Sequence, residues 1–599
     1  MPRSRWAASI AVLTTLAVLV AGGSIASARS RGVPASSNGL GLTGAPGQQT
    51  ADAGDDGTAG PPTDYSGIEG LSQPVYQTER TVHEVTAFDG IKLYVEIEKP
   101  KDAPAGMKFP VILEASPYHG TLADRKGTRI FPGMGNIGLS GYFAPRGYAV
   151  AFMNLRGTGR SDGCLDHLAM NDARDLKTVI EWLADQPWSN GRVGMTGHSY
   201  VGATQVVAAA QDPRGLVTIV PSAGLSRMYD HQFQMGVPYN LQYAGPIFAY
   251  ELLALQRQLP NIGTFPGTGG STGDNFGQDM TYFGCGIPNS AAFAGHGQAT
   301  GMAQNWHAAR DWADAAARWD GDVFMVHGTN DNAARIPNAE WFFKLRDPED
   351  HPGDKVWLGQ WDHSTSQMGF RKEQWIEAAH AWFDNKLMQL DVDTGPPVEI
   401  FVNDDAAIGS QQYTYTSDSW ADASGEAVTL FPTAADSSLG LTVPAAGSKS
   451  YQSSPNTFTE FTSAPLESET LLVGPPPNLK LTASTIGQRL NIITTLYADN
   501  GGSRRAINYC AMNVELRNGI YTSTPVVPGQ EMLLEPQCFT VAGLVHAGEK
   551  LVLRIGAAGP HWVGTWTADP QVTIYTGPGK SSLTLPVVTD PVLYDDVLA

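Results

Sequence analysis

The chain has 599 residues, with 59 acidic and 39 basic side chains and a formal net charge of −20 at pH 7. An acidic balance of this size argues against nucleic-acid binding, because the phosphate backbone repels negative charge. The chain is also too long for a single hydrophobic core, so its length predicts two or three domains.

The first 28 residues indicate a secretory signal peptide. They begin with Arg3 and Arg5, continue as an uncharged apolar run over 6–22, and end in Ala26-Ser27-Ala28, a small-residue cleavage site. A membrane anchor is the alternative, but the run is shorter than the roughly 20 residues that a spanning helix needs. We predict cleavage near Ala28 and a secreted protein of net charge −22 without stable membrane association.

Residues 29–72 are rich in Gly, Ala, Ser, Thr and Pro and contain few large apolar side chains. A segment of this composition buries too little apolar surface to fold. We therefore predict a low-complexity, disordered linker between the signal peptide and the first domain.

Strands alternate with helices between residues 73 and 390. Segments 108–115 and 148–153 are nearly continuous apolar runs, which is typical of parallel strands covered on both faces, and 173–186 has the apolar spacing of an amphipathic helix. The series continues with strands at 193–196, 216–220, 322–326 and 355–361 and helices at 336–345 and 374–383. This alternation predicts an α/β catalytic domain at 73–390 with a doubly wound sheet.

The alternation lapses between about 225 and 319, where Gly, Gln and aromatic residues replace it. We interpret this segment as an inserted cap that walls a substrate pocket above the sheet. Aromatic side chains of such a segment either line the pocket or pack the cap. The candidates are Tyr229, Tyr239, Tyr243, Phe248 and Trp306.

After about residue 390 the pattern changes to short β-type runs separated by Gly, Pro, Asn and Ser, and no internal repeat is visible. The runs are 398–402, 479–483, 490–497, 512–516, 551–555 and 572–575. They predict a C-terminal β-sandwich or jelly roll at 391–599.

The four cysteines are Cys164, Cys285, Cys510 and Cys538, an even number that an exported protein can oxidise. Their positions favour Cys510 with Cys538 in one domain and Cys164 with Cys285 in another. Four buried free thiols are the alternative.

A candidate nucleophile, Ser199, lies at the turn between a strand and a helix of small residues at 201–210. Such a turn exposes the hydroxyl, and Gly197 and Gly202 remove side chains that would crowd it. The helix N-terminus also favours negative charge beside the serine. The second glycine is three residues after the serine rather than two, and an ordinary helix N-cap serine is the alternative.

A serine nucleophile needs a base and an acid, which in the α/β-hydrolase order follow it as acid and then histidine. Asp331 follows the strand at 322–326, and His363 follows the strand at 355–361, so both lie at carboxyl ends of strands. We therefore predict the triad Ser199, Asp331 and His363. His198, His327 and His119 compete as the base, although His198 adjoins the serine and His327 lies within its strand, so neither of these two is well placed to face Ser199. Asp362 competes as the acid, but as the immediate neighbour of His363 it would reach the ring poorly.

The oxyanion of an acyl-transfer reaction needs hydrogen-bond donors. We predict the backbone N–H of Tyr200 as one donor and the hydroxyl of Tyr118, in the loop after the first apolar strand, as the other. No His, Asp or Glu cluster has metal-ligand spacing, so we predict no catalytic metal and no cofactor.

Six short motifs stand out as a set: Ser116-Pro117-Tyr118; Arg-Gly-Thr-Gly-Arg-Ser-Asp-Gly at 156–163; Gln-Pro-Trp-Ser-Asn-Gly at 186–191; Gly-His-Ser-Tyr-Val-Gly at 197–202; His-Gly-Thr-Asn-Asp at 327–331; and Trp-Asp-His at 361–363. Together they resemble the X-prolyl dipeptidyl peptidase and cocaine esterase family of α/β-hydrolase serine hydrolases, from about residue 111 to the C-terminus. The resemblance implies Ser199 as nucleophile, Asp331 as acid, His363 as base and Tyr118 in the oxyanion hole, with a helical cap and a C-terminal jelly roll.

The sequence departs from the family at Asn154, where an aspartate is common, and at Ala333-Ala334, where the family often has Val just after an Asn. Neither departure touches the triad, but both weaken any assignment to one branch of the family.

Three functions are compatible with these residues: a peptidase that removes N-terminal X-Pro dipeptides, an esterase or amidase with the same triad, and a carbohydrate- or cell-wall-binding protein that has lost catalysis. The expected partner is a peptide or small acyl substrate. Tyr229, Asp230 and Trp306 are candidate substrate-binding residues, and Asp230 or Glu251 could hold a substrate amine. The sequence leaves the oligomeric state open, a homodimer included.

Overall fold

The structure is a computed structural model that describes residues 69–117, 138–240, 301–363, 372–403, 412–487, 490–562 and 570–595. The predictions for the signal peptide and for all but the last residues of the linker lie outside these ranges. So do those for Tyr118, His119, Tyr243, Phe248, Glu251 and Cys285. No helix within the described ranges is long and apolar enough to span a lipid bilayer.

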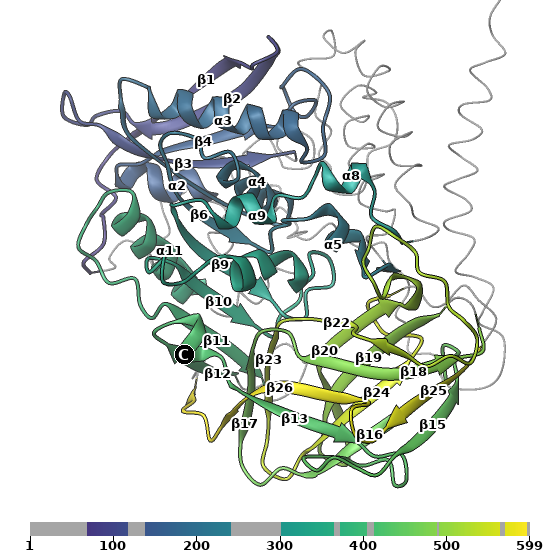
Figure 1. Cartoon of the computed structure of the whole chain (residues 1–599). Coiled ribbons are helices and arrows are strands. Elements are labelled where there is room, and N and C mark those ends of the chain that lie inside the picture. The colour runs from purple at the N-terminus through teal and green to yellow at the C-terminus, as the bar shows by residue number, and fades with distance from the viewer. Residues whose placement is uncertain are drawn as a thin grey trace, which may run out of the picture. The chain divides into compact units, whose positions relative to one another are not determined.

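Eleven strands of the described chain form one mixed sheet (Figure 1). In spatial order they are β1 (Thr78–Thr86), β2 (Lys92–Pro100), β4 (Ala149–Asn154), β3 (Phe109–Ser116), β5 (Ser189–His198), β6 (Leu216–Ser222), β9 (Asp322–Gly328), β10 (Lys355–Gly359), β11 (Val398–Asn403), β12 (Gln412–Ser417) and β27 (Tyr594–Asp595). The strands from β4 to β11 are parallel to one another, and the pairings at both edges are antiparallel. The doubly wound α/β fold is therefore confirmed.

Each central strand buries both of its faces, which explains why its sequence is a continuous apolar run. In β3, Val111 and Leu113 belong to one core cluster and Ile112 to the other. The first cluster holds the apolar faces of α3 (Met170–Ala184) and α4 (Tyr200–Ala209), and the second holds those of α2 (Gly138–Phe143) and α11 (Lys372–Lys386). The alternation of side chains along one strand thus anchors helices on two faces of the sheet.

Two local expectations differ from the structure, and one hairpin has no counterpart among the predicted elements. The strand β11, which we grouped with the C-terminal β region, instead pairs with β10 and extends the α/β sheet. The single helix expected at 336–345 is a 3₁₀ turn, η4 (Ile336–Ala339), followed by a π-type turn, η5 (Trp341–Leu345). The hairpin β1–β2 was not anticipated, because its strands alternate buried and exposed residues instead of forming apolar runs.

The described parts of the predicted cap, 225–240 and 301–319, contain short elements. These are α5 (Met228–Gln232), the hairpin β7 (Phe233–Gln234) and β8 (Val237–Pro238), α8 (Asn305–Ala308) and α9 (Ala313–Ala317). Trp312 Nε1 donates to the carbonyl oxygen of Leu168 at 2.7 Å, and this bond ties the end of the cap to the loop before α3.

The C-terminal region is β-rich, as predicted, and its described strands form two further sheets (Figure 1). One contains β13 (Glu426–Pro432), β14 (Leu439–Gly440), β15 (Gly447–Gln452), β17 (Thr470–Gly474), β18 (Asn478–Thr485), β21 (Met532–Leu534), β23 (Val541–Val545), β25 (Gln571–Thr576) and β26 (Ser582–Thr589). The other contains β16 (Phe458–Pro465), β24 (Lys550–Gly556), β19 (Asn491–Asp499), β20 (Arg504–Asn513) and β22 (Gln537–Cys538). Apolar side chains from both sheets share one core, which makes this region a β-sandwich.

A disulfide joins Cys510 on β20 to Cys538 on β22, at directly paired positions of the two strands. This pairing is the one expected from the sequence. Cys164 is also disulfide-bonded. Its expected partner, Cys285, lies outside the described residues, so that pairing stays a prediction.

Replacing both Cys510 and Cys538 by alanine should lower the free energy of unfolding of the β-sandwich by about 3 to 4 kcal/mol, because the unfolded chain loses the constraint of a closed loop. The loop has a sequence separation of 28 residues. Guanidinium unfolding followed by circular dichroism measures the change, with wild-type protein in dithiothreitol as the control. An unchanged unfolding midpoint in both samples would contradict the prediction.

Candidate active site

Ser199 lies at the sharp turn between β5 and α4, and its backbone adopts φ 62° and ψ −122°. A positive φ is strained for a residue with a side chain, and such strain is typical of a nucleophile held outward from a strand-to-helix turn. The turn depends on its glycines: Gly197 has φ 143°, and a Cβ atom on Gly202 would lie 2.6 Å from the carbonyl oxygen of Ser222. The backbone around Ser199 therefore forms the strand-to-helix turn that the sequence predicts.

The structure brings Ser199, His363 and Asp331 into one hydrogen-bonded chain. His363 Nε2 lies 2.9 Å from Ser199 Oγ, and His363 Nδ1 lies 2.8 Å from Asp331 Oδ2. The carboxylate requires the proton on Nδ1, so Nε2 presents its lone pair to the serine hydroxyl. A histidine in this tautomer can accept the serine proton.

Within this hydrogen-bonded chain, His363 and Asp331 each stabilise the charged form of the other. Burial lowers the pKa of His363, but the charge and the hydrogen bond of Asp331 outweigh burial and raise that pKa above its usual 6.5. Burial raises the pKa of Asp331, and the imidazole of His363 together with the Ala333 N–H, 2.7 Å from Asp331 Oδ1, lowers it below its usual 3.8. Asp331 therefore stays ionised at neutral pH and favours a positive charge on His363.

Of the two expected oxyanion donors, only Tyr200 lies among the described residues. It is the first residue of α4, which places its backbone N–H at the positive end of the helix. β3 ends at Ser116, next to β5 in the sheet, and Tyr118 would follow two residues later.

The candidate substrate-binding residues show other contacts. Tyr229 donates from Oη to the carbonyl oxygen of Gly301 at 2.8 Å and stacks on Phe233, so it packs within the cap. The Trp306 ring lies 4.1 Å from the guanidinium of Arg310. These contacts fit the packing interpretation of the cap aromatics.

Asp230 is buried and faces charged groups outside the triad. Its Oδ2 atom lies 3.8 Å from the guanidinium of Arg227. Burial raises the pKa of Asp230 to about 7, with the Arg227 charge opposing the rise and the Glu340 charge adding to it. If a second cation, in addition to Arg227, lay against this carboxyl group, the carboxyl group would be fully ionised at neutral pH.

Sequence reasoning missed a buried cation near the triad, Arg335, which has no solvent exposure. Its guanidinium lies 3.9 Å from the ring centroid of Tyr239, and its Nη2 donates to Asn240 Oδ1 at 3.3 Å and to the carbonyl oxygen of His561 at 3.2 Å. Burial lowers the pKa of Arg335 to about 10, which still leaves it charged at neutral pH. No motif marked this residue, because its partners come from the cap and from the loop after β24.

Two buried histidines near the triad were also missed. Burial, aided by the charges of Arg335 and His363, lowers the pKa of His231 to about 3. Burial and Arg335 lower the pKa of His561 to about 3, and the Asp331 charge opposes the fall at both residues. Both rings are therefore neutral over the working range of a serine hydrolase.

The rival base candidates are engaged elsewhere. His327 donates from Nε2 to the carbonyl oxygen of Ala334 at 2.6 Å, and His198 donates from Nε2 to the carbonyl oxygen of His363 at 2.9 Å. Asp362 acts on the imidazole by its charge and contributes to the raised pKa of His363.

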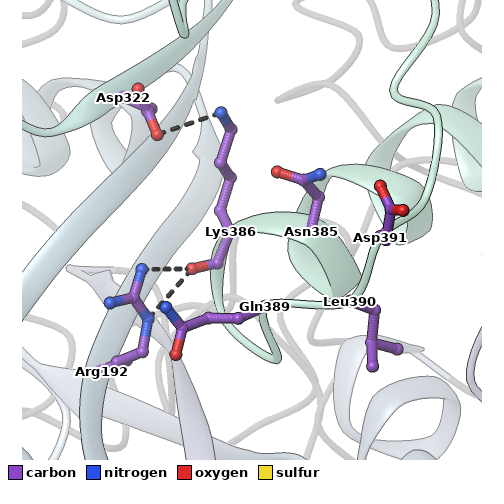
Figure 2. A pocket seen from close by; sticks show the side chains of 7 residues that line it. All are labelled: Arg192, Asp322, Asn385, Lys386, Gln389, Leu390 and Asp391. Carbon is purple, nitrogen blue, oxygen red and sulfur yellow. Dashed lines mark hydrogen bonds and ion pairs between the residues drawn. The ribbon is translucent and has the colours of Figure 1, made fainter.

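A shallow pocket of about 430 Å³ lies at the amino-terminal edge of the sheet, away from the triad. Figure 2 shows Lys386 pointing to Asp322 and Arg192 pointing to the Lys386 carbonyl oxygen. Lys386 and Asp322 thus form an ion pair, and Arg192 bonds the backbone. Within the described ranges, no group of three or more His, Cys, Asp or Glu side chains is placed to hold a metal ion.

Two family models match the chain. The model of the X-Pro dipeptidyl-peptidase (S15 family) matches residues 89–365, and the model of the X-Pro dipeptidyl-peptidase C-terminal non-catalytic domain matches residues 391–586. A Streptomyces avermitilis protein provisionally named Xaa-Pro dipeptidyl-peptidase is 30% identical over 407 residues, covering 60% of this chain and 53% of that protein. The chain spans about half the length of the first curated relatives it matches.

Solved structures share the fold at low sequence identity. A CocE/NonD family hydrolase from Staphylococcus aureus superposes with a TM-score of 0.69 at 20% identity, covering 86% of this chain and 93% of its own. An α-amino acid ester hydrolase superposes with a TM-score of 0.65 at 17% identity, covering 87% and 98% of the two chains.

The fold and the site together define a serine hydrolase of the α/β-hydrolase class. Because family models match both the α/β region and the β-sandwich, the chain belongs to the X-Pro dipeptidyl-peptidase (S15) family, whose fold it shares with CocE/NonD hydrolases. The resemblance drawn from the six sequence motifs is confirmed at the level of the family.

Activity should fall as the pH drops through the pKa of His363, because only the neutral imidazole can accept the serine proton. Since Asp331 raises this pKa, the midpoint of the acid limb should lie above about 6.5. In Asp331→Asn the charge is lost and the residual activity should show its midpoint at lower pH. The rate of inactivation by a fluorophosphonate across pH 5 to 9, about the range where histidine titrates, measures both. Equal midpoints would show that Asp331 does not act on the base.

Proposed function

We propose that this protein is a secreted serine peptidase that releases X-Pro dipeptides from peptide N-termini through an acyl-enzyme on Ser199. The observation that carries the proposal is the chain of hydrogen bonds from Ser199 Oγ through His363 to Asp331. Membership of the X-Pro dipeptidyl-peptidase family supports the substrate class. The disulfide between Cys510 and Cys538 supports an oxidising, extracellular location.

In the proposed mechanism, His363 Nε2 takes the proton of Ser199 as Oγ attacks the carbonyl carbon of the proline, the second residue of the substrate. The Tyr200 N–H and the Tyr118 hydroxyl donate to the oxyanion. The imidazolium, stabilised by Asp331, then gives its proton to the leaving nitrogen as the C–N bond breaks. A water molecule, deprotonated by His363, attacks the acyl-enzyme and releases the dipeptide.

We propose Asp230 as the partner of the substrate N-terminal ammonium, with Tyr229 and Trp306 shaping the cap around it. The raised pKa of Asp230 supports this role, because a buried carboxyl that is half neutral near pH 7 gains most from a new cation. Its ion pair with Arg227 is long, at 3.8 Å, and leaves the carboxylate incompletely balanced.

A carboxylic-ester hydrolase or amidase is the second candidate, and Arg335 favours it. This buried cation acts on His363 and would repel a substrate ammonium placed beside it. An acyl ester without an amine avoids that repulsion, and it needs no acidic partner.

Replacing Ser199 or His363 by alanine, or Asp331 by asparagine, should lower kcat by about 10⁴- to 10⁶-fold while the fold survives, because the three groups act as a unit. Turnover of purified variants measures the loss, and circular dichroism checks the fold. A fluorophosphonate should label wild-type protein at Ser199 and leave Ser199→Ala unlabelled. Unlabelled wild-type protein would favour the non-catalytic binding protein instead.

The substrate class is decided by a matched pair of substrates. Ala-Pro p-nitroanilide should be cleaved, and the same compound with an acetylated amine should not, because a peptidase of this class must bind the free ammonium. Release of p-nitroaniline measures both reactions. Equal cleavage of the two substrates, or activity only on p-nitrophenyl acetate, would contradict the peptidase proposal and favour the esterase.

A further inference from the structure

His198, the residue before the candidate nucleophile, lies between the end of β6 and the loop that carries His363. Its Nε2 lies 2.9 Å from the carbonyl oxygen of His363, and its Nδ1 lies 3.1 Å from Ser222 Oγ. The rings of His198 and His363 are 4.7 Å apart between centroids. One side chain therefore touches both the backbone and the ring of the candidate base.

The partners of His198 fix its protonation. A carbonyl oxygen only accepts, so Nε2 carries the proton and Nδ1 accepts from the Ser222 hydroxyl. Burial, followed by the charge of His363, lowers the pKa of His198 to about 3, and Asp331 and His327 are the other titratable groups that act on it. His198 is thus neutral and has no lone pair available for the Ser199 proton.

Ser222 connects the hydrogen bonds of His198 to the candidate nucleophile. Its carbonyl oxygen accepts from the Ser199 N–H at 2.9 Å, while its hydroxyl holds the His198 ring. A continuous path therefore runs from the backbone of Ser199 through Ser222 and His198 to the backbone of His363. This path is separate from the Asp331 side-chain bond.

We propose that His198 is a positioning residue, which fixes the backbone of His363 so that Nε2 stays in line with Ser199 Oγ. The inference rests on the proposed function, since it assigns work to the same nucleophile and base. His198 transfers no proton itself. Its loss should act on the rate of serine attack and leave substrate binding nearly unchanged.

Two variants of His198 test its two hydrogen bonds separately. In His198→Gln the amide nitrogen takes the place of Nε2 and can still donate to the His363 carbonyl oxygen. In His198→Asn the shorter side chain keeps a bond to Ser222 but does not reach His363. The two side chains are both neutral amides, so they differ mainly in reach.

His198→Asn should lower kcat by about 10- to 100-fold with KM changed less than about threefold, because a small displacement of the base slows the attack. His198→Gln should keep kcat within about threefold of wild type. In His198→Asn the acid limb should also move to lower pH, because a displaced imidazole loses part of the Asp331 bond that raises its pKa.

The measurements are the fluorophosphonate inactivation rate and the turnover of whichever of Ala-Pro p-nitroanilide and p-nitrophenyl acetate the wild type cleaves. Rates are normalised to folded protein by the final extent of labelling. A wild-type rate in His198→Asn, equal losses in both variants, or a loss that disappears on normalisation would overturn the positioning role. Failure of the wild type to label at Ser199 would instead overturn the proposed function.

Discussion

The hydrogen bond between Ser199 and His363 joins residues from strands that are not neighbours. β6 and β9 lie between β5, which leads to Ser199, and β10, which leads to His363. Three strand spacings of about 4.8 Å each separate the two strand ends by roughly 14 Å, a distance that neither side chain spans alone. The loops must therefore fold across the sheet edge. The Asn330 N–H donates to the carbonyl oxygen of Trp361 at 3.2 Å, and the His198 ring donates to the carbonyl oxygen of His363. These two bonds hold the loop that carries His363 over β9 and toward β5.

The electrostatic character of the site follows from burial. Asp331 is 1% exposed and ionised, and the ring that it holds has a raised pKa. The surrounding histidines, His198, His231 and His561, are kept neutral by burial. One imidazole among four can thus gain a proton near neutral pH, because only His363 has a carboxylate against its ring.

The hydrogen-bonded arrangement of the candidate triad could be predicted from the sequence because its signals are local. Ser199, Asp331 and His363 each follow a recognisable strand, and parallel strands place their carboxyl ends at one edge. Arg335, His231 and His561 could not be predicted. These residues come near the site because distant segments of the chain pack together; Arg335 and His561, for example, are more than 200 residues apart in the sequence. The spacing of residues in a sequence does not predict such contacts.

The same distinction applies to the fold. Apolar runs identified the central strands, but the run at 398–402 does not say which sheet it joins, and that choice depends on its pairing with β10. At 336–345 the apolar residues suggest a single helix, but the segment begins as a 3₁₀ turn with Pro337 in its first positions, and the Arg346 N–H bonds the carbonyl oxygen of Trp341, five residues back. Tertiary contacts of Arg346, with Asp354 and the carbonyl oxygen of Trp319, compensate for that local irregularity.

The β-sandwich contributes to the site although its family model is described as non-catalytic. The carbonyl oxygen of His561 accepts from Arg335, and Trp562 stacks on Tyr239, whose ring lies beneath the same guanidinium. Arg335 is therefore held from one side by the cap and from the other by the sandwich. Because Arg335 acts on the pKa of His363, the loop at 557–562, which holds Arg335, also influences the charge of the candidate base. A change in this loop can thus alter the protonation of His363 without replacing any residue of the candidate triad.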